Sequence, residues 1–495
     1  MEPPVRYVST QDILEHCPVH AVWEITLACN LKCHHCGSRA GKRRPDELST
    51  EECLDIVRQL ARLGTREVTL IGGEAYLRPD WATIIRAIRD AGMMCTLQTG
   101  GLSLTDKRIR EAAEAGLQAA GVSIDGLRDL HDRLRGVPGS FVAAFDALRR
   151  LRAHGITTSV NTQITAMVLP QLRRLMELFI AAGAKNWQVQ LTVAMGRAAD
   201  HPEFLLQPYQ MLELMPLLAD LYQAAAPRGL LLQPGNNIGY FGPYESLLRG
   251  SGMEDVHWTS CTAGRNALGI EADGTIKGCP SLATATYAGG NIRDMSLEDI
   301  WLLTPELSFA RTKTRDELWG FCRTCYYAEV CTGGCTWTAD SLLGRRGNNP
   351  YCHHRALELA KHNVRERIVQ VERAPGQSFD HGRFELVLES LNGEVIPSPQ
   401  PACELYELSL IPRRDSVGSH AVAHEVSEQA RRKIPFLELC RGCNRHVFPG
   451  TDVCPHCDGD IKQLARTYDE NLATARQAYQ RLLALLQSID SPSWT

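Results

Sequence analysis

Three cysteines lie close together near the start of the chain: Cys29, Cys33 and Cys36, in the spacing C-x3-C-x2-C. They follow an apolar run over residues 21–27, which predicts a buried strand. A [4Fe-4S] cluster is usually held by four cysteines, so three at this spacing leave one iron free for a ligand that is not protein. A zinc knuckle or a disulfide pair fits less well, because three thiolates leave a zinc ion without its fourth ligand. The triplet therefore predicts an iron–sulfur centre with an open corner.

Strand-like and helix-like segments alternate after the triplet. Ser49 and Glu52 have the spacing of a capping box and mark the start of the first helix. The expected strands cover residues 22–26, 68–71, 94–98, 119–124, 157–164 and 187–191, and further helices are expected at 80–91, 105–115, 140–153 and 172–182. Such alternation predicts a parallel sheet flanked by helices, with the functional residues at the carboxyl ends of the strands. Six units are too few for a complete eight-fold barrel.

The triplet after a first strand resembles the radical S-adenosylmethionine (SAM) superfamily. The resemblance implies a partial (βα)6 barrel, and it implies that the open iron binds the methionine part of SAM. One electron from the cluster would then split SAM into methionine and a 5'-deoxyadenosyl radical. Gly72-Gly73-Glu74 follows the second expected strand, at the position of the family's Gly-Gly-Glu segment. A Gly-Gly turn alone more often only ends a strand or helix, but its position one strand after the triplet strengthens the match.

The same resemblance assigns contacts to SAM. Gly73 and Glu74 are expected to hold the methionine amine, and Ser123 the ribose or carboxylate. Arg135 is expected to pair with the SAM carboxylate through its fork of N–H donors, with a surface salt bridge as the alternative. His35 stands where the family usually places an aromatic ring near the adenine.

A second group of seven cysteines resembles the SPASM extension, which carries two auxiliary [4Fe-4S] clusters and would bring the total to three. By this resemblance an outer cluster is held by Cys322, Cys325, Cys331 and Cys352, and an inner cluster by Cys261, Cys279 and Cys335. Two zinc sites are the alternative. The inner cluster lacks a fourth cysteine, so one iron is expected to be open, bound by water, or held by Asp255 or His257.

A third group near the C-terminus consists of two C-x2-C pairs: Cys440, Cys443, Cys454 and Cys457. Four thiolates form the tetrahedral set of structural zinc, with rubredoxin-like iron as the alternative. His446 and His456 are expected to be bystanders, because four cysteines already close the site. A strand over 384–388 and an amphipathic helix over 464–486 complete this part of the chain.

The expected architecture is therefore α/β. A SPASM auxiliary-cluster domain and a small zinc-ribbon-like domain follow the partial barrel. The expected domains are an N-terminal segment (1–20), the barrel (21–235), the SPASM domain (236–372) and an accessory domain with the four-cysteine site (373–495).

Composition excludes several classes of protein. A net charge of −4 gives no general field for nucleic acid or an anionic membrane, and no apolar stretch is long enough to span a bilayer. The N-terminus has no signal-peptide core, which favours the cytoplasm. Eighteen cysteines in a cytoplasmic chain indicate metal ligands rather than disulfides.

Most enzymes with a SPASM extension modify ribosomally made peptides, so the resemblance implies a maturase that oxidises or cross-links a precursor peptide. Its electron donor would be a flavodoxin or ferredoxin. Formylglycine formation in sulfatases is an alternative, but those relatives place an acidic base after the cysteine equivalent to Cys279, and here Pro280 follows it. Tetrapyrrole side-chain modification and a non-catalytic iron–sulfur scaffold are further alternatives.

Overall fold

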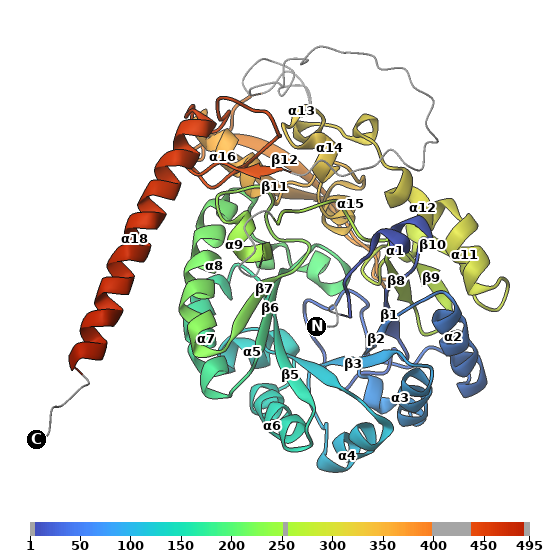
Figure 1. The fold of residues 1–495 in the computed structure, drawn as a ribbon. Coiled ribbons are helices and arrows are strands. Elements are labelled where there is room, and N and C mark those ends of the chain that lie inside the picture. The colour runs from blue at the N-terminus through green and yellow to red at the C-terminus, as the bar shows by residue number, and fades with distance from the viewer. Residues whose placement is uncertain (1–4, 251–255, 398–436, 490–495) are drawn as a thin grey trace, which may run out of the picture.

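The computed structural model describes residues 5–250, 256–397 and 437–489 (Figure 1). No helix in these ranges is both long enough and apolar enough to cross a membrane.

A curved ten-stranded sheet forms the centre of the molecule, in the order β10-β9-β8-β1-β2-β3-β4-β5-β6-β7 (Figure 1). Strands β1 to β7 run parallel to their neighbours and β8 adds a further parallel strand beside β1, whereas β9 and β10 are antiparallel. The strands are β1 (His20–Glu24), β2 (Glu67–Ile71), β3 (Met94–Thr99), β4 (Ala119–Ser123), β5 (Thr157–Ile164), β6 (Asn186–Leu191), β7 (Leu231–Pro234), β8 (Ala267–Ile270), β9 (Thr275–Lys277) and β10 (Ala288–Asn291). The partial barrel is thus confirmed, and the sequence reading found its first six strands.

Helices cover the outer face of this sheet (Figure 1). They are α2 (Thr50–Arg62), α3 (Trp81–Asp90), α4 (Asp106–Ala115), α5 (Arg128–Arg135), α6 (Ser140–Ala153), α7 (Leu172–Ala181) and α8 (Met211–Ala225). The expected capping box is present at α2, since the Ser49 hydroxyl accepts from the Glu52 amide and the Glu52 carboxylate accepts from the Ser49 amide. Trp23 and Trp187 are fully buried between sheet and helices.

Short helices and a hairpin make up the second cysteine region. The helices are α9 (Glu245–Gly250), α10 (Thr284–Tyr287), α11 (Leu297–Leu303), α12 (Pro305–Thr312), α13 (Phe321–Thr324), α14 (Ala328–Cys331), α15 (Thr336–Leu343) and α16 (His353–Lys361). The hairpin pairs β11 (Val364–Glu372) with β12 (Arg383–Ser390), which contains the expected strand 384–388. This hairpin crosses the expected boundary at residue 372, and the division into domains remains a prediction.

The C-terminal part contains a small hairpin and one long helix. β13 (Glu438–Leu439) pairs with β14 (His446–Val447), and α18 (Ile461–Ile489) then stands off the body as a single helix (Figure 1). At the other end of the chain, α1 (Thr10–Leu14) precedes β1.

Candidate active site and metal centres

The cysteine triplet lies in the loop after β1, at the carboxyl edge of the sheet. Two backbone hydrogen bonds of 2.8 Å fasten the Gly-Gly-Glu segment to this loop, from the Gly73 amide to the Thr26 carbonyl and from the Glu74 amide to the Ala28 carbonyl. A Cβ atom at Gly73 would lie 2.1 Å from the Ala28 carbonyl oxygen. Glycine is therefore required here by the close approach of two chain segments, whatever ligand binds beside them.

The three thiols of the triplet suit a cluster better than a single ion. A site for a single metal ion needs ligand atoms that all lie within about 4.8 Å of one another. Among the described residues, the three Sγ atoms of the triplet do not meet this condition. Burial, and then the Glu74 carboxylate, raises the pKa of Cys29 to about 12. Burial also raises the pKa of Cys33, whose Sγ lies 3.6 Å from Nη1 of Arg135. Metal coordination deprotonates such thiols outright, so these residues fit an iron–sulfur group that supplies the compensating charge.

A buried carboxylate that the sequence reading missed connects two of the expected SAM contacts. Asp125 Oδ2 accepts from His35 Nε2 at 2.8 Å and from Arg135 Nη2 at 2.5 Å, and Oδ1 accepts from the Gln163 amide at 2.7 Å. Although burial pushes the pKa of Asp125 upward, Arg135 and His35 hold it well below its usual range. Asp125 follows β4 by two residues, and a carboxylate just beyond the end of a strand was the available signal.

The other expected SAM contacts lie at the same edge of the sheet. The Glu74 carboxylate accepts from Thr99 Oγ1 at 2.5 Å and from the Gly100 amide at 2.7 Å, which ties the ends of β2 and β3 together. Burial raises the pKa of Glu74 to about 7. Ser123 is the last residue of β4. His35 Nδ1 is buried without a hydrogen-bond partner among the described atoms, so this nitrogen is available to a ligand.

The seven auxiliary cysteines gather in two sets. Burial, and then the neighbouring thiols of Cys261 and Cys279, raises the pKa of Cys335 to about 12. Burial also raises the pKa of Cys325, and the neighbouring thiols of Cys322, Cys352 and Cys331 raise it further. The two sets coincide with the expected inner and outer groups.

A buried lysine lies near both sets. Burial lowers the pKa of Lys313, and the thiols of Cys261, Cys331 and Cys322 oppose that shift. Its ammonium group has no hydrogen-bond partner within the described ranges. Lys313 therefore lies close to thiols of both auxiliary sets, a placement that no motif in the sequence indicated.

Of the two candidates for the extra ligand of the inner set, the structure describes only His257. His257 Nδ1 lies 3.0 Å from the Trp258 carbonyl oxygen, and its ring centroid lies 5.2 Å from that of His446. Asp255 lies outside the described residues. A non-cysteine ligand at this position remains a prediction.

The loop between β11 and β12 reaches back to the triplet. The Phe379 amide donates to the Gly37 carbonyl at 3.1 Å, and the Arg39 Nε donates to Asp380 Oδ1 at 2.9 Å. Lys277 Nζ lies 3.7 Å from the centre of the Phe379 ring, and Phe379 adopts a φ of 56°. A bulky residue rarely adopts this conformation, which marks a locally strained segment held in place by its surroundings.

The C-terminal group of four cysteines has a different geometry. The Sγ atoms of Cys440 and Cys457 lie 3.8 Å apart, those of Cys443 and Cys454 lie 3.7 Å apart, and all four lie within 4.8 Å of one another. Zn–S bonds of about 2.3 Å in a tetrahedron place the sulfur atoms about 3.8 Å apart. The spacing therefore fits one tetrahedral ion and is too tight for a cubane cluster.

The region that holds these four cysteines, residues 437–460, is called the ribbon below. It docks beside the outer set of auxiliary cysteines. The Tyr327 hydroxyl donates to the His446 carbonyl at 2.6 Å and lies 2.8 Å from His456 Nε2. Arg445 Nη1 forms a buried ion pair with Glu358 at 2.9 Å. Leu437 and Phe448 of the ribbon share an apolar cluster with three of the auxiliary cysteines, Cys331, Cys335 and Cys352.

A second set of close ligand atoms, in His354, Glu358 and His456, occurs at this interface. The Arg445 guanidinium already donates to His354 Nδ1 and pairs with Glu358. A cation there would be repelled by this buried guanidinium, so the set is an ion-paired interface and not a metal site.

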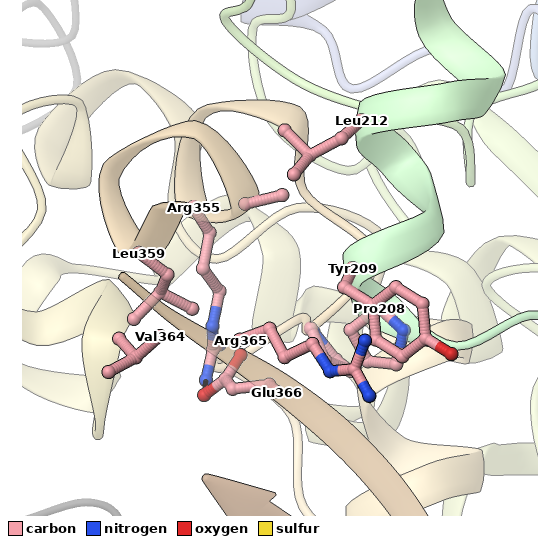
Figure 2. Close-up of a pocket in the computed structure, with 10 residues that line it drawn as sticks. Pro208, Tyr209, Leu212, Arg355, Leu359, Val364, Arg365 and Glu366 are labelled. Carbon is pink, nitrogen blue, oxygen red and sulfur yellow. Dashed lines mark hydrogen bonds and ion pairs between the residues drawn. The ribbon is translucent and has the colours of Figure 1, made fainter. Parts of the chain in front are cut away.

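A pocket lies elsewhere, between α8, α16 and β11 (Figure 2). Two of its charged residues, Arg355 and Glu366, form an ion pair at 2.6 Å, and the Arg365 guanidinium lies 4.3 Å from the Tyr209 ring centre. None of the expected site residues lines it.

A partial barrel that presents three thiols at its carboxyl edge, joined to a cysteine-rich extension, defines an iron–sulfur enzyme. The radical SAM superfamily model matches residues 23–178, and the SPASM iron–sulfur cluster-binding domain matches residues 261–326. The chain is 30% identical over 353 residues to the AdoMet-dependent heme synthase of Oleidesulfovibrio alaskensis, covering 67% of this chain and 86% of the relative. It is 29% identical to mycofactocin maturase MftC of Mycobacterium ulcerans, covering 74% of this chain and 94% of the relative.

Among solved structures, Streptococcus suis SuiB bound to the precursor peptide SuiA has a similar fold. The TM-score is 0.54 at 18% identity, over 69% of this chain and 77% of SuiB. The chain therefore belongs to the radical SAM superfamily and carries a SPASM domain. It is an enzyme that uses iron–sulfur clusters and SAM.

Proposed function

We propose that the protein is a peptide maturase that abstracts hydrogen from a residue of a ribosomally made precursor peptide and thereby oxidises or cross-links it. When bound, the reduced cluster and SAM supply a 5'-deoxyadenosyl radical that takes one hydrogen atom from the substrate. The substrate then loses one electron and one proton as its new bond forms, so the product is two hydrogens lighter. Auxiliary clusters held by the second group of cysteines would accept the second electron, and a flavodoxin or ferredoxin would supply the first.

The residues at the barrel edge have defined tasks in this proposal. Cys29, Cys33 and Cys36 hold the first cluster. Asp125 fixes the orientation of Arg135 and His35, because one carboxylate oxygen accepts from both. These two side chains, with Ser123 and the Gly73-Glu74 segment, bind SAM.

Two auxiliary clusters and one zinc ion complete the proposed cofactors. The inner set of three cysteines and the outer set of four hold the clusters, and the ribbon holds zinc, as the sulfur spacing of 3.7–3.8 Å supports.

The observation that favours a peptide substrate is the pairing of cationic side chains with carboxylates in and around the loop after β1. Four cationic side chains in the loop after β1 and at the ends of α5 and β9 are already paired with carboxylates of the same chain, at 2.5 to 3.0 Å. The pairs are Arg39 with Asp200 and Asp380, Arg44 with Glu271 and Asp273, Arg135 with Asp125, and Lys277 with Glu271. A substrate with several carboxylates would have to compete with these internal carboxylates for the four cations, whereas an uncharged peptide segment would not.

Tetrapyrrole modification is the second candidate, and one observation favours it: the relative at 30% identity is named a heme synthase. Formylglycine formation has no such support, since Pro280 occupies the position expected for the acidic base. The scaffold alternative is set aside, because the chain belongs to an enzyme superfamily.

Co-expression with a short peptide encoded beside the gene tests the proposal. High-resolution mass spectrometry is expected to find the peptide two hydrogens lighter, and unmodified when co-expressed with the Cys36→Ala variant. A parallel reaction contains a porphyrin that bears propionate groups. An unchanged peptide together with loss of carbon dioxide from the porphyrin would overturn the proposal in favour of the second candidate.

A further inference from the structure

The long helix α18 carries an apolar stripe with a period of 3.5 residues. Apolar residues recur at alternating steps of four and three along one side of the helix. They are Ile461, Ala465, Tyr468, Leu472, Ala475, Tyr479 and Leu482. This repeat is the sequence pattern of a coiled-coil seam and differs from the broader face that a helix turns toward a globular core.

Much of this stripe has no partner in the described part of the chain. Ile461 packs on the ribbon core and the Arg441 guanidinium lies 4.5 Å from the Tyr468 ring centre, but every side chain from 473 to 483 is exposed. Tyr479 is 61% exposed and Leu482 is 52% exposed. Figure 1 shows the helix extending away from the body. A helix in water gains most of its stability by burying such a face, so a partner is expected.

We propose that α18 pairs with the same helix of a second copy in an antiparallel coiled coil. In this register each small residue of the seam meets a large one: Ala465 lies against the partner's Leu482, and Leu472 lies against the partner's Ala475. Tyr468 then meets the partner's Tyr479. Both orientations place tyrosine against tyrosine, but a parallel pair would also stack alanine on alanine and leucine on leucine, in alternating thin and thick layers that cannot pack evenly.

Charge beside the seam selects the same register. Asp469 and Arg476 flank the stripe on one side, are exposed, and have no ion-pair partner within the described ranges. In the antiparallel register Asp469 faces the partner's Arg476, and the twofold axis repeats the pair. The helix is thus complementary to itself in both volume and charge, as an interface between identical subunits requires. This self-complementarity identifies a second copy as the occupant, in preference to the substrate peptide or another protein.

Analytical ultracentrifugation of the full-length holoenzyme over a concentration series tests this pairing. The wild type is expected to be a dimer. Leu472→Asp places a charge in the seam of both copies and should weaken association by about a hundredfold or more. Gln477→Asp, on the opposite side of the helix, is the matched control and should leave the dimer intact. Production of 5'-deoxyadenosine by each variant verifies that the enzyme is folded.

Charge exchange tests the register. Asp469→Arg or Arg476→Asp alone should weaken the dimer by about tenfold, because two attractive pairs become repulsive. The double variant Asp469→Arg/Arg476→Asp should restore wild-type association. A monomeric wild type, or a dimer unaffected by Leu472→Asp, would overturn the proposal. Failure of the double variant to recover would overturn the antiparallel register.

Discussion

The barrel edge and the C-terminal ribbon both place cysteines at short sequence spacings, yet they build opposite kinds of site. In the ribbon, four sulfurs converge with pair distances of 3.7 and 3.8 Å and are packed among Val447, Ile461 and Leu464. At the barrel edge, three sulfurs are spread more widely and lie among charged groups. The nearest guanidinium nitrogen, of Arg135, is 3.6 Å from the sulfur of Cys33.

The surroundings of the thiols, as well as their count, therefore separate a reactive centre from a structural one. Four converged thiols in an apolar shell leave no position for a substrate. Three spread thiols beside Glu74, Asp125 and Arg135 leave a corner open and supply groups that can orient a polar ligand. Four predictions test this contrast.

The largest effect is expected at the barrel edge. Replacing Cys29, Cys33 or Cys36 with alanine should abolish SAM cleavage, because each thiolate is needed to present the open iron. Chromatography of quenched, reduced reactions measures the 5'-deoxyadenosine formed. Cys53→Ala, in the buried face of α2, is the matched control and should retain activity. Undiminished product in any of the three triplet variants would remove the basis of the contrast.

Loss of one ribbon thiolate should affect structure and leave chemistry intact. Cys440→Ser is expected to lose about one zinc per chain, because a closed site needs all four ligands and its coordination energy is part of the folding energy. Elemental analysis gives the zinc-to-iron ratio, and hydrogen exchange of residues 437–460 reports unfolding of the ribbon. The contrast fails if this variant keeps its zinc, or if a fully folded variant no longer cleaves SAM.

The next largest effect is expected from the ion pair between Arg445 of the ribbon and Glu358 of α16. Arg445→Met removes the buried guanidinium from Glu358, which then keeps Lys361, at 3.2 Å, as its charged partner, and should destabilise the docked ribbon by up to about 3 kcal/mol. Hydrogen exchange measures the opening free energy of the ribbon. Adding Glu358→Gln removes the carboxylate charge that has lost Arg445 and should recover part of the loss. If both variants open equally easily, the ion pair is not what holds the ribbon.

The smallest effect concerns the barrel alone. Ser49→Ala removes the cap of α2 and should lower the free energy of unfolding by about 1 kcal/mol, whereas Ser49→Asp should retain most of it. Chemical denaturation followed by circular dichroism provides the values. Zinc content should not change in either variant, and a change would mean that the two regions are less separate than their metal sites indicate.

Local patterns predicted much of the barrel. The strand over 157–164 and the helix over 140–153 match β5 and α6 residue for residue, because the period of their apolar residues is encoded in adjacent positions. The two auxiliary sets of cysteines lie near one another as the SPASM resemblance implied, while their role as cluster ligands stays a prediction.

Features that depend on distant segments were missed. β8 pairs with β1 although the other five expected strands and most of the barrel helices lie between them in the sequence. Asp125 acquires its partners only when the triplet loop and α5 fold against the end of β4. The contact of Phe379 with Gly37 joins a hairpin loop to the cluster loop, and nothing in either segment alone specifies the other.

The pairing of β8 with β1 has a consequence for folding. Strand β1 pairs with β2 on one side and with β8 on the other, and β8 follows the rest of the barrel in the sequence. The hydrogen bonding of β1 is therefore incomplete until residue 270 has been synthesised. Contacts of such long sequence separation slow folding, because the intervening chain must be ordered first. The barrel and the auxiliary region should therefore unfold in one transition, and proteolysis between residues 235 and 267 should release no stable barrel.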